Sequence, residues 1–291
     1  MRRSLLAGVS ALLLCTPVYA ADLIIEAPQD DATASAAGMR GVVEIGALGR
    51  SAAEDDGDYE SFAGLYGAFD LQADLDGVVL GLDGYGEWLS IEDSDPNVTN
   101  GSLGVLGVRL GTRVEDWYFG GFAALGSYPN AENDDMFFGY AAGVQAAVAV
   151  EDLLLIGTLG YADAPNDDDP EGFAGWFVEG AAAFALSDDF AVSAMAGYGY
   201  SADFDVEDDP GEYVSWGIKG AYRIPGDLNL SLVASYEGIH AFDDDDESNT
   251  NHTVRLGISI PFGGSGSALD ALRPMASPTA PFRASVSADV M

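Results

Sequence analysis

The stretch FFGYAAGVQAAVAVEDLLLIGTLGYADAPNDDDPEG, residues 137–172, contains the pattern on which the fold of the whole chain depends. From Phe138 to Val150 every second residue is apolar, and the residues between them are small or polar. A period of two indicates an extended strand with one strongly apolar face. Glu151-Asp152 interrupts the pattern, a second apolar run follows to Tyr161, and the acidic segment 163–172 comes next. The predicted unit is therefore strand, tight turn, strand and long acidic loop.

The same unit recurs along the chain and predicts twelve strands. Short connections rich in turn-forming residues, such as Asp74-Leu-Asp-Gly77, alternate with long connections. The long connections contain acidic clusters, such as Glu54-Asp55-Asp56, and no Lys or Arg. The predicted strands lie near 42–50, 62–73, 77–89, 103–113, 117–127, 137–150, 153–162, 173–186, 190–202, 213–224, 228–241 and 253–262.

An even number of strands, with short turns at one rim and long loops at the other, is typical of a transmembrane β-barrel. Hydrocarbon cannot satisfy backbone N–H and C=O groups, so a sheet in a bilayer has to close on itself. Residues 42–262 thus resemble Gram-negative outer-membrane β-barrel proteins of the small porin-like type. The resemblance implies an all-β, antiparallel up-and-down barrel in contact with outer-membrane lipid and lipopolysaccharide. It also implies periplasmic termini and external long loops.

The N-terminal residues indicate export. Arg2 and Arg3 precede the apolar run 5–14, and the small-residue site Val18-Tyr19-Ala20 follows, which predicts a signal peptide over residues 1–20. Cys15, the single cysteine, would leave with it, so we expect no disulfide and no thiolate metal site in the mature chain. Residues 21–41 lack sustained periodicity and are expected to form a periplasmic N-terminal segment.

The last predicted strand alternates apolar residues from Val254 to Phe262 with Thr253, Arg255 and Ser259. It resembles the C-terminal strand that outer-membrane proteins present to their assembly machinery, which we therefore expect as a partner. The Gly/Ser/Ala/Pro-rich tail 263–291 follows it, without periodicity. We expect a flexible periplasmic tail here; a plug or a periplasmic tether is the less favoured interpretation.

The composition excludes some classes of function. The chain has 48 acidic against 11 basic residues, a formal net charge of −37, yet 48% of its residues are hydrophobic. The charge must therefore be segregated from the apolar surface. Binding of nucleic acid is not expected, because phosphate contacts need clustered Lys and Arg.

Aromatic residues on the apolar parity concentrate at strand ends rather than at mid-strand, as expected where rings lie at headgroup depth. Those near the short turns are Phe69, Trp117, Phe119, Phe184, Phe190, Tyr222 and Phe262. Those near the long loops are Trp88, Tyr140, Tyr161, Trp176, Tyr198, Tyr200, Trp216 and Tyr236. A soluble β-sandwich would place its large residues at mid-strand instead.

The opposite parity carries the charged residues of the strands. An outward Arg would cost about 2–4 kcal/mol at the bilayer midplane, so this face is expected to point into the lumen. The residues predicted to line a pore are Glu44, Asp70, Asp83, Glu87, Arg109, Arg113, Gln145, Glu179, Lys219, Arg223, Glu237 and Arg255.

Two interpretations of these lumen charges stay open. One is a water-filled pore for passive diffusion of ions or small hydrophilic solutes, with a preference for cations because acidic loops surround its mouth. The other is a structural or surface-interaction barrel whose closed interior is braced by ion pairs. Twelve strands fall between the eight that fill an interior and the sixteen that leave a channel. Oligomeric state is left open.

Catalysis and a dedicated metal site are not expected. The acidic run 243–247 offers oxygen ligands for divalent cations at the rim but lacks the spacing and Gly of an EF-hand. His240 and His252 flank this run and leave a hydrolase acting on lipid or peptide as a minor alternative. No serine nucleophile with an orienting partner can be placed beside them. We therefore predict no enzyme activity, no cofactor and no catalytic residue.

Overall fold

A computed structural model describes the chain over residues 38–54, 59–91, 102–129, 136–166, 171–201, 210–226, 228–243, 248–264, 267–272, 276 and 278–288. The predicted signal peptide, including Cys15, lies outside these residues, as do residues 21–37 and most of the acidic clusters of the long connections.

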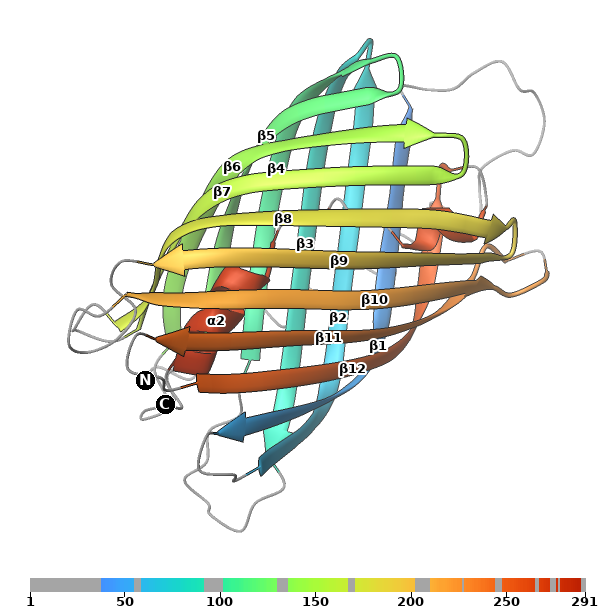
Figure 1. Cartoon of the computed structure of the whole chain (residues 1–291). Coiled ribbons are helices and arrows are strands. Elements are labelled where there is room, and N and C mark those ends of the chain that lie inside the picture. Colours follow the sequence, from blue (N-terminus) through green and yellow to red (C-terminus); the bar gives the residue numbers. More distant parts are fainter. Residues whose placement is uncertain are drawn as a thin grey trace, which may run out of the picture. The chain divides into compact units, whose positions relative to one another are not determined.

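The described residues form a closed antiparallel barrel of twelve strands, which confirms the predicted fold class (Figure 1). Each strand pairs with its neighbours in sequence, and β1 pairs with β12 to close the ring. The strands are β1 (Met39–Glu54), β2 (Tyr59–Leu75), β3 (Val78–Ile91), β4 (Ser102–Val114), β5 (Trp117–Pro129), β6 (Met136–Val150), β7 (Leu153–Asn166), β8 (Glu171–Ser187), β9 (Phe190–Ser201), β10 (Gly211–Arg223), β11 (Ser231–Asp243) and β12 (Ser248–Phe262).

Most strands extend beyond their predicted limits. β1 begins at Met39, so the barrel includes the end of the segment 21–41 that was expected to lie outside it. Backbone pairing also continues into acidic sequence, since Ala53 of β1 is still paired with Tyr59 of β2. The cause is that ladder hydrogen bonds join backbone groups and do not require an apolar side chain.

Short turns are tight at the predicted places. Asp76, Glu115 and Glu151 have positive φ angles of 53°, 54° and 52°, in the left-handed region that hairpin turns use. Gly77, with φ 88°, follows Asp76 in the same turn. These turns set the register of the three hairpins that contain them.

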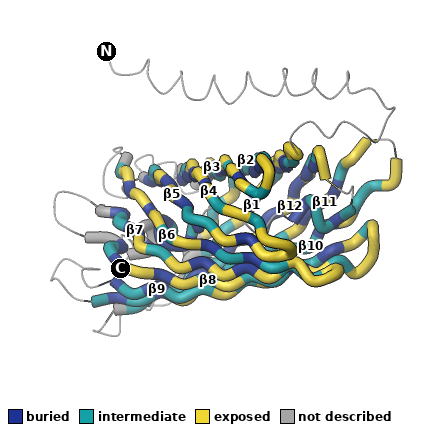
Figure 2. Tube along the Cα trace, turned by 90° about the horizontal axis from the view of Figure 1, so that it is seen from above, coloured by how far each residue is buried: buried dark blue, intermediate teal, exposed yellow. Residues whose placement is uncertain are grey.

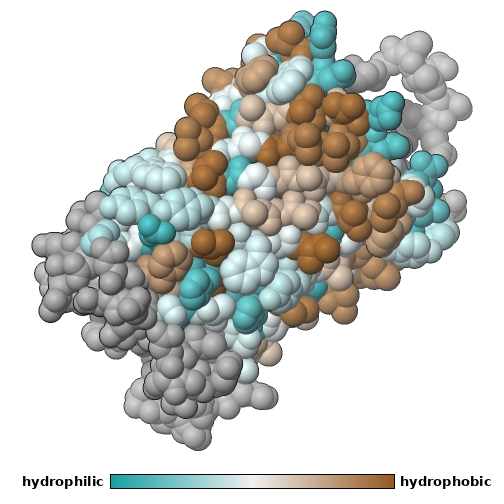
Figure 3. All heavy atoms as spheres, in the orientation of Figure 1, coloured by the Kyte–Doolittle hydropathy of each residue, from teal (hydrophilic) through white to brown (hydrophobic). Residues whose placement is uncertain are grey.

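Buried and exposed residues alternate along the strands (Figure 2). On β12, Leu256 is 63% exposed, whereas its neighbour Arg255 is 4% exposed. Hydrophobic side chains gather on the outer face across several strands (Figure 3). Aromatic residues near the strand ends, among them Trp88, Trp117 and Trp176, are exposed there. The barrel therefore has an apolar exterior and a charged interior, as the period of two predicts.

The tail after β12 differs from the expected flexible extension. Its described parts form a 3-10 helix, η1 (Ala268–Ala271), and an α-helix, α2 (Ala280–Ala288). Helix α2 contacts β5, β7, β8, β11 and β12, strands from separate parts of the wall, so it lies inside the ring (Figure 1). The prediction of a flexible periplasmic tail is wrong for these residues, because their apolar side chains find a complementary interior surface.

The tail passes from one end of the lumen toward the other. Near the short turns, the backbone N–H of Ala268 donates to the carbonyl of Asp188, 2.9 Å away, and Ala268 packs against Ala191. Helix α2 instead packs near the long-loop ends of the strands, where Phe282 belongs to one buried cluster with Tyr128 and Phe173. Among the described residues, no helix has the length and apolar character needed to cross a membrane.

Candidate functional site in the barrel lumen

The residues predicted to line a pore all take the inward parity. Seven are buried: Glu44, Asp70, Asp83, Glu87, Arg109, Gln145 and Arg255. Five are partly exposed: Arg113, Glu179, Lys219, Arg223 and Glu237. The structure divides them into three groups of ion pairs, together with Gln145 and Glu179, which form none among the described residues.

The first group lies on three adjacent strands. Asp70 on β2 and Asp83 on β3 are register partners, and Arg109 on β4 lies beside them. The Nη2 of Arg109 donates to Oδ1 of Asp70 at 2.7 Å, and its Nε lies 3.3 Å from Oδ1 of Asp83. Two carboxylates thus share one guanidinium, against the wall of the lumen.

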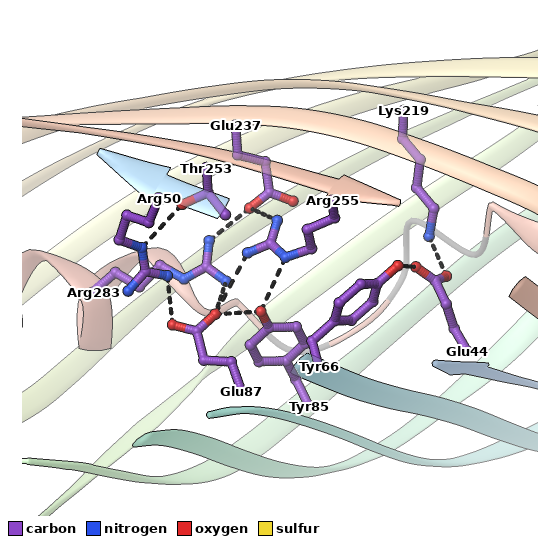
Figure 4. Close-up of polar contacts among 10 residues, drawn as sticks. All are labelled: Glu44, Arg50, Tyr66, Tyr85, Glu87, Lys219, Glu237, Thr253, Arg255 and Arg283. Atoms are coloured by element: carbon purple, nitrogen blue, oxygen red, sulfur yellow. Dashed lines mark hydrogen bonds and ion pairs between the residues drawn. The ribbon is translucent and has the colours of Figure 1, made fainter. Parts of the chain in front are cut away.

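The second group crosses the lumen. The Nζ of Lys219 on β10 lies 2.5 Å from Oε2 of Glu44 on β1, although these strands are not neighbours in the sheet. The hydroxyl of Tyr66 donates to the other oxygen of Glu44 at 2.8 Å. Glu44 is therefore held from two directions (Figure 4).

Another part of this cross-lumen network joins the tail to the wall. Glu87 on β3 pairs with Arg50 at 2.5 Å, with Arg255 at 3.7 Å and with Arg283 of α2 at 3.3 Å. Glu237 on β11 pairs with Arg255 at 2.7 Å and with Arg283 at 2.6 Å. Two carboxylates and three guanidiniums, from β1, β3, β11, β12 and α2, therefore meet in the lumen (Figure 4).

Tyr85 lies in the middle of this network. Its hydroxyl donates to Glu87 and accepts from Nε of Arg255 at 3.0 Å. The guanidinium of Arg283 lies 5.2 Å from the centre of the Tyr85 ring, a distance at which a cation is attracted to the ring face. Burial and the nearby Arg255 disfavour the charged form of Arg283, but the facing Tyr85, Glu87 and Glu237 raise its pKa above the ordinary value.

The third group lies at the short-turn rim. Arg113 pairs with Asp74 at 3.6 Å, and Arg223 pairs with Asp189 at 3.0 Å. The two arginine side chains are 36% and 37% exposed. Arg113 and Arg223 therefore contribute to the entrance and not to the centre of the lumen.

Sequence reasoning missed five members of the network: Arg50, Tyr66, Tyr85, Thr253 and Arg283. Arg50 shares the even parity of Glu44 on β1, so the strand pattern contained its signal. Tyr66 and Tyr85 face inward, where their hydroxyls donate to Glu44 and Glu87, whereas aromatic residues were expected on the lipid face. Arg283 lies in the tail, for which no strand pattern applies.

A cavity of about 220 Å³ remains between the wall and the tail. Its polar lining includes Glu44, Glu179 and Lys219, and its apolar lining includes Ile156 and Leu272. Protein atoms therefore fill most of the lumen in this conformation, and the cavity is the part that they leave empty.

The two histidines lie away from the lumen charges. Nδ1 of His252 lies 2.8 Å from the hydroxyl of Tyr236, and the His252 ring stacks on the same exposed tyrosine. Nδ1 of His240 lies 2.8 Å from Oγ1 of Thr250. Neither contact includes a carboxylate. Among the described residues, no group of three or more His, Cys, Asp or Glu side chains is arranged to hold a metal ion.

No protein-family model matches the chain, and no curated protein is significantly similar to it in sequence. Solved structures do resemble it. An outer-membrane channel from Pseudomonas putida F1 is similar with a TM-score of 0.56 at 12% identity, covering 81% of this chain and 100% of that chain. The KdgM porin is similar with a TM-score of 0.47 at 9% identity, covering 76% of this chain and 99% of that one. The translocator domain of the autotransporter NalP from Neisseria meningitidis has a TM-score of 0.46 at 15% identity, covering 88% and 97%. The chain therefore shares the closed β-barrel fold of the outer-membrane channel from Pseudomonas putida F1.

Proposed function

We propose that this protein is an outer-membrane channel for passive diffusion of small hydrophilic solutes, with a preference for cations, whose lumen is occupied by its own C-terminal tail. The observation that carries the proposal is a closed barrel with an apolar exterior and ionised side chains inside. An interior that served packing alone would be at least as stable with apolar residues, since buried ion pairs seldom add stability over them. The similar channel of Pseudomonas putida F1 supports the proposal by analogy of fold.

Cation preference follows from the balance of charge. The described lumen groups away from the short-turn rim comprise the acids Glu44, Asp70, Asp83, Glu87, Glu179 and Glu237 and the bases Arg50, Arg109, Lys219, Arg255 and Arg283. Acids exceed bases by one, and the whole chain carries a formal charge of −37. A negative field at the mouth concentrates cations and repels anions.

The remaining expectations complete this proposal. Residues 1–20 direct export and are cleaved, the assembly machinery recognises β12, and lipid and lipopolysaccharide surround the exterior. Acidic residues of the long connections bind divalent cations at the rim, where lipopolysaccharide phosphates need them. The protein catalyses no reaction.

A planar bilayer experiment tests the proposal with two forms of the protein. Full-length protein should give low or rare conductance, because the tail fills the lumen. A variant lacking residues 263–291 should give steady conductance, with a reversal potential that favours potassium over chloride. Retained heat-modifiable mobility in electrophoresis and β-rich circular dichroism show that the truncated barrel has folded.

Two substitutions in the truncated variant test the origin of selectivity. Glu179→Gln should weaken cation preference, because it removes a carboxylate without an ion pair among the described residues. Asp83→Asn should weaken it less, because Arg109 already compensates Asp83 at 3.3 Å. Equal effects of the two substitutions would contradict this charge assignment.

A structural barrel is the second candidate function. The ion pairs that join β1 to β10 and β3 to β12 across the lumen favour it, because they brace the ring. A truncated variant that folds but stays silent in the bilayer would replace the channel by this alternative.

A further inference from the structure

Glu179 on β8 differs from the other carboxylates at the centre of the lumen. Each of those carboxylates takes part in an ion pair: Glu44, Asp70, Asp83, Glu87 and Glu237. Glu179 forms none with a described residue, and its Oε1 is buried without a hydrogen-bond partner. A carboxylate oxygen that is buried without a partner is costly, so a group that supplies positive charge there would be bound favourably.

The strand register places Glu179 in a row of polar side chains. Thr158 on β7 is its partner on one side, and Gly197 on β9 is its partner on the other. Ser215 on β10 follows Gly197, and Gln145 on β6 precedes Thr158. Oγ of Ser215 and Oε1 of Gln145 are buried without partners, and both residues are 4% exposed. The row thus presents several oxygen atoms that can accept hydrogen bonds and lack a donor.

Gly197 brings Glu179 and Ser215 close together. A Cβ atom at position 197 would lie 2.6 Å from Oγ of Ser215 and 2.9 Å from Cγ of Glu179. Any side chain larger than hydrogen would therefore push the two groups apart. The absence of a side chain at Gly197 therefore lets Glu179 and Ser215 approach each other along the wall.

The cavity of about 220 Å³ is lined by Glu179 and Thr158 of this row, but not by Ser215 or Gln145, and also by the tail residues Leu272 and Pro278. This volume is below the roughly 300–1,000 Å³ of sites for drug-sized ligands. It suits a small molecule. Apolar groups such as Ile156 and Ala181 complete the lining, which favours an organic body over a bare ion.

We propose that Glu179, with Thr158 beside it in the cavity lining, forms a binding site for a small organic cation that carries an ammonium or guanidinium group. Such a group has three to five N–H donors, and the unpartnered Oε1 of Glu179 is an acceptor for them. The proposal rests on the proposed function, since the ligand enters as a solute of the channel.

An anion fits this cavity less well. Lys219, Arg255 and Arg283 also line it, but each already pairs with Glu44 or Glu237. An anion would have to break one of these pairs, whereas a cation at Glu179 breaks none. A cation at this position also makes the charge of the central lumen neutral.

The test measures equilibrium binding to the folded full-length protein in detergent, at 150 mM salt to screen the acidic surface. n-Butylammonium, n-butanol and butyrate are compared by calorimetric titration. We expect n-butylammonium to bind with one site per chain and the other two not to bind. Binding of butyrate, or absence of n-butylammonium binding, would overturn the proposal.

Two carboxylate-to-amide variants locate the site. Glu179→Gln keeps the shape and removes the charge, and should weaken n-butylammonium binding at least tenfold. Glu115→Gln removes the same charge at a short turn outside the lumen, and should leave binding unchanged. Equal weakening in both variants would mean a general surface effect and would refute the assignment. The binding experiment does not require the ligand to permeate the barrel. Absence of binding therefore refutes the cation site, whereas absence of conductance in the bilayer refutes only the proposed channel.

Discussion

Replacing Arg283 by Ala should release the tail from the lumen. Arg283 is the residue through which α2 forms ion pairs with the wall, at 2.6 Å to Glu237 and 3.3 Å to Glu87, and its side chain is 11% exposed. Truncating one partner of a buried, hydrogen-bonded charge pair costs about 2–5 kcal/mol. The lower end applies here, because Glu87 keeps Arg50 and Arg255, and Glu237 keeps Arg255.

A loss of about 2 kcal/mol changes the ratio of released to docked tail by about 30-fold. Single-channel recording of Arg283→Ala should therefore show the open state of the truncated variant with a probability far above that of the full-length protein. Arg283→Lys keeps the charge but loses the forked guanidinium, so its open probability should lie between the two.

Two results would refute this reasoning. One is an open probability of Arg283→Ala equal to that of the unmodified protein, while the variant without residues 263–291 conducts. The other is an equal increase for Arg223→Ala, which removes an arginine from the rim pair with Asp189 and should leave the tail docked.

Three further predictions concern the tail and the two faces of the barrel. Gly126→Ala would place its Cβ 2.5 Å from the Phe282 ring and should make the tail more sensitive to protease, whereas Gly67→Ala, with its nearest atom at 3.9 Å, should not. An epitope added after Met291 should be reached by antibody from the long-loop side, because α2 lies near that end; labelling from the short-turn side alone would contradict the path of the tail. Leu106→Arg should lower the free energy of unfolding in lipid vesicles by about 2–4 kcal/mol, because Leu106 is 51% exposed on the lipid face. The free energy is measured by urea titration, and a midpoint of Leu106→Arg equal to that of the unmodified protein would show that this face does not contact hydrocarbon.

The barrel could be predicted because its signals are local. Alternation along a run such as 138–150 decides the strand and its two faces, and turns such as 76–77 decide the hairpins. Parity also assigns the charged strand residues from Glu44 to Arg255 to the face that is buried or partly buried in the structure. These properties depend on neighbours in sequence or in the adjacent strand.

The pairing across the lumen could not be predicted in the same way. That Lys219 meets Glu44 depends on which strands face each other after closure, and no local pattern contains this information. The tail was misjudged for a related reason. Thr279 and Pro281 are residues typical of a helix start, but nine residues form a stable helix mainly through tertiary packing. For α2 that packing is the interior surface around Phe282.

The position of α2 has a consequence for biogenesis. Strand β12 pairs with β1 from Phe262 to Asn249, and helices η1 and α2, which follow β12, lie within the ring that this seam completes. The segment that contains η1 and α2 must therefore enter the barrel before β1 and β12 pair, or thread through the finished ring from the short-turn opening. In the second route, maturation has a step beyond membrane insertion, and a newly inserted molecule passes through an unplugged stage before it reaches the conformation described above.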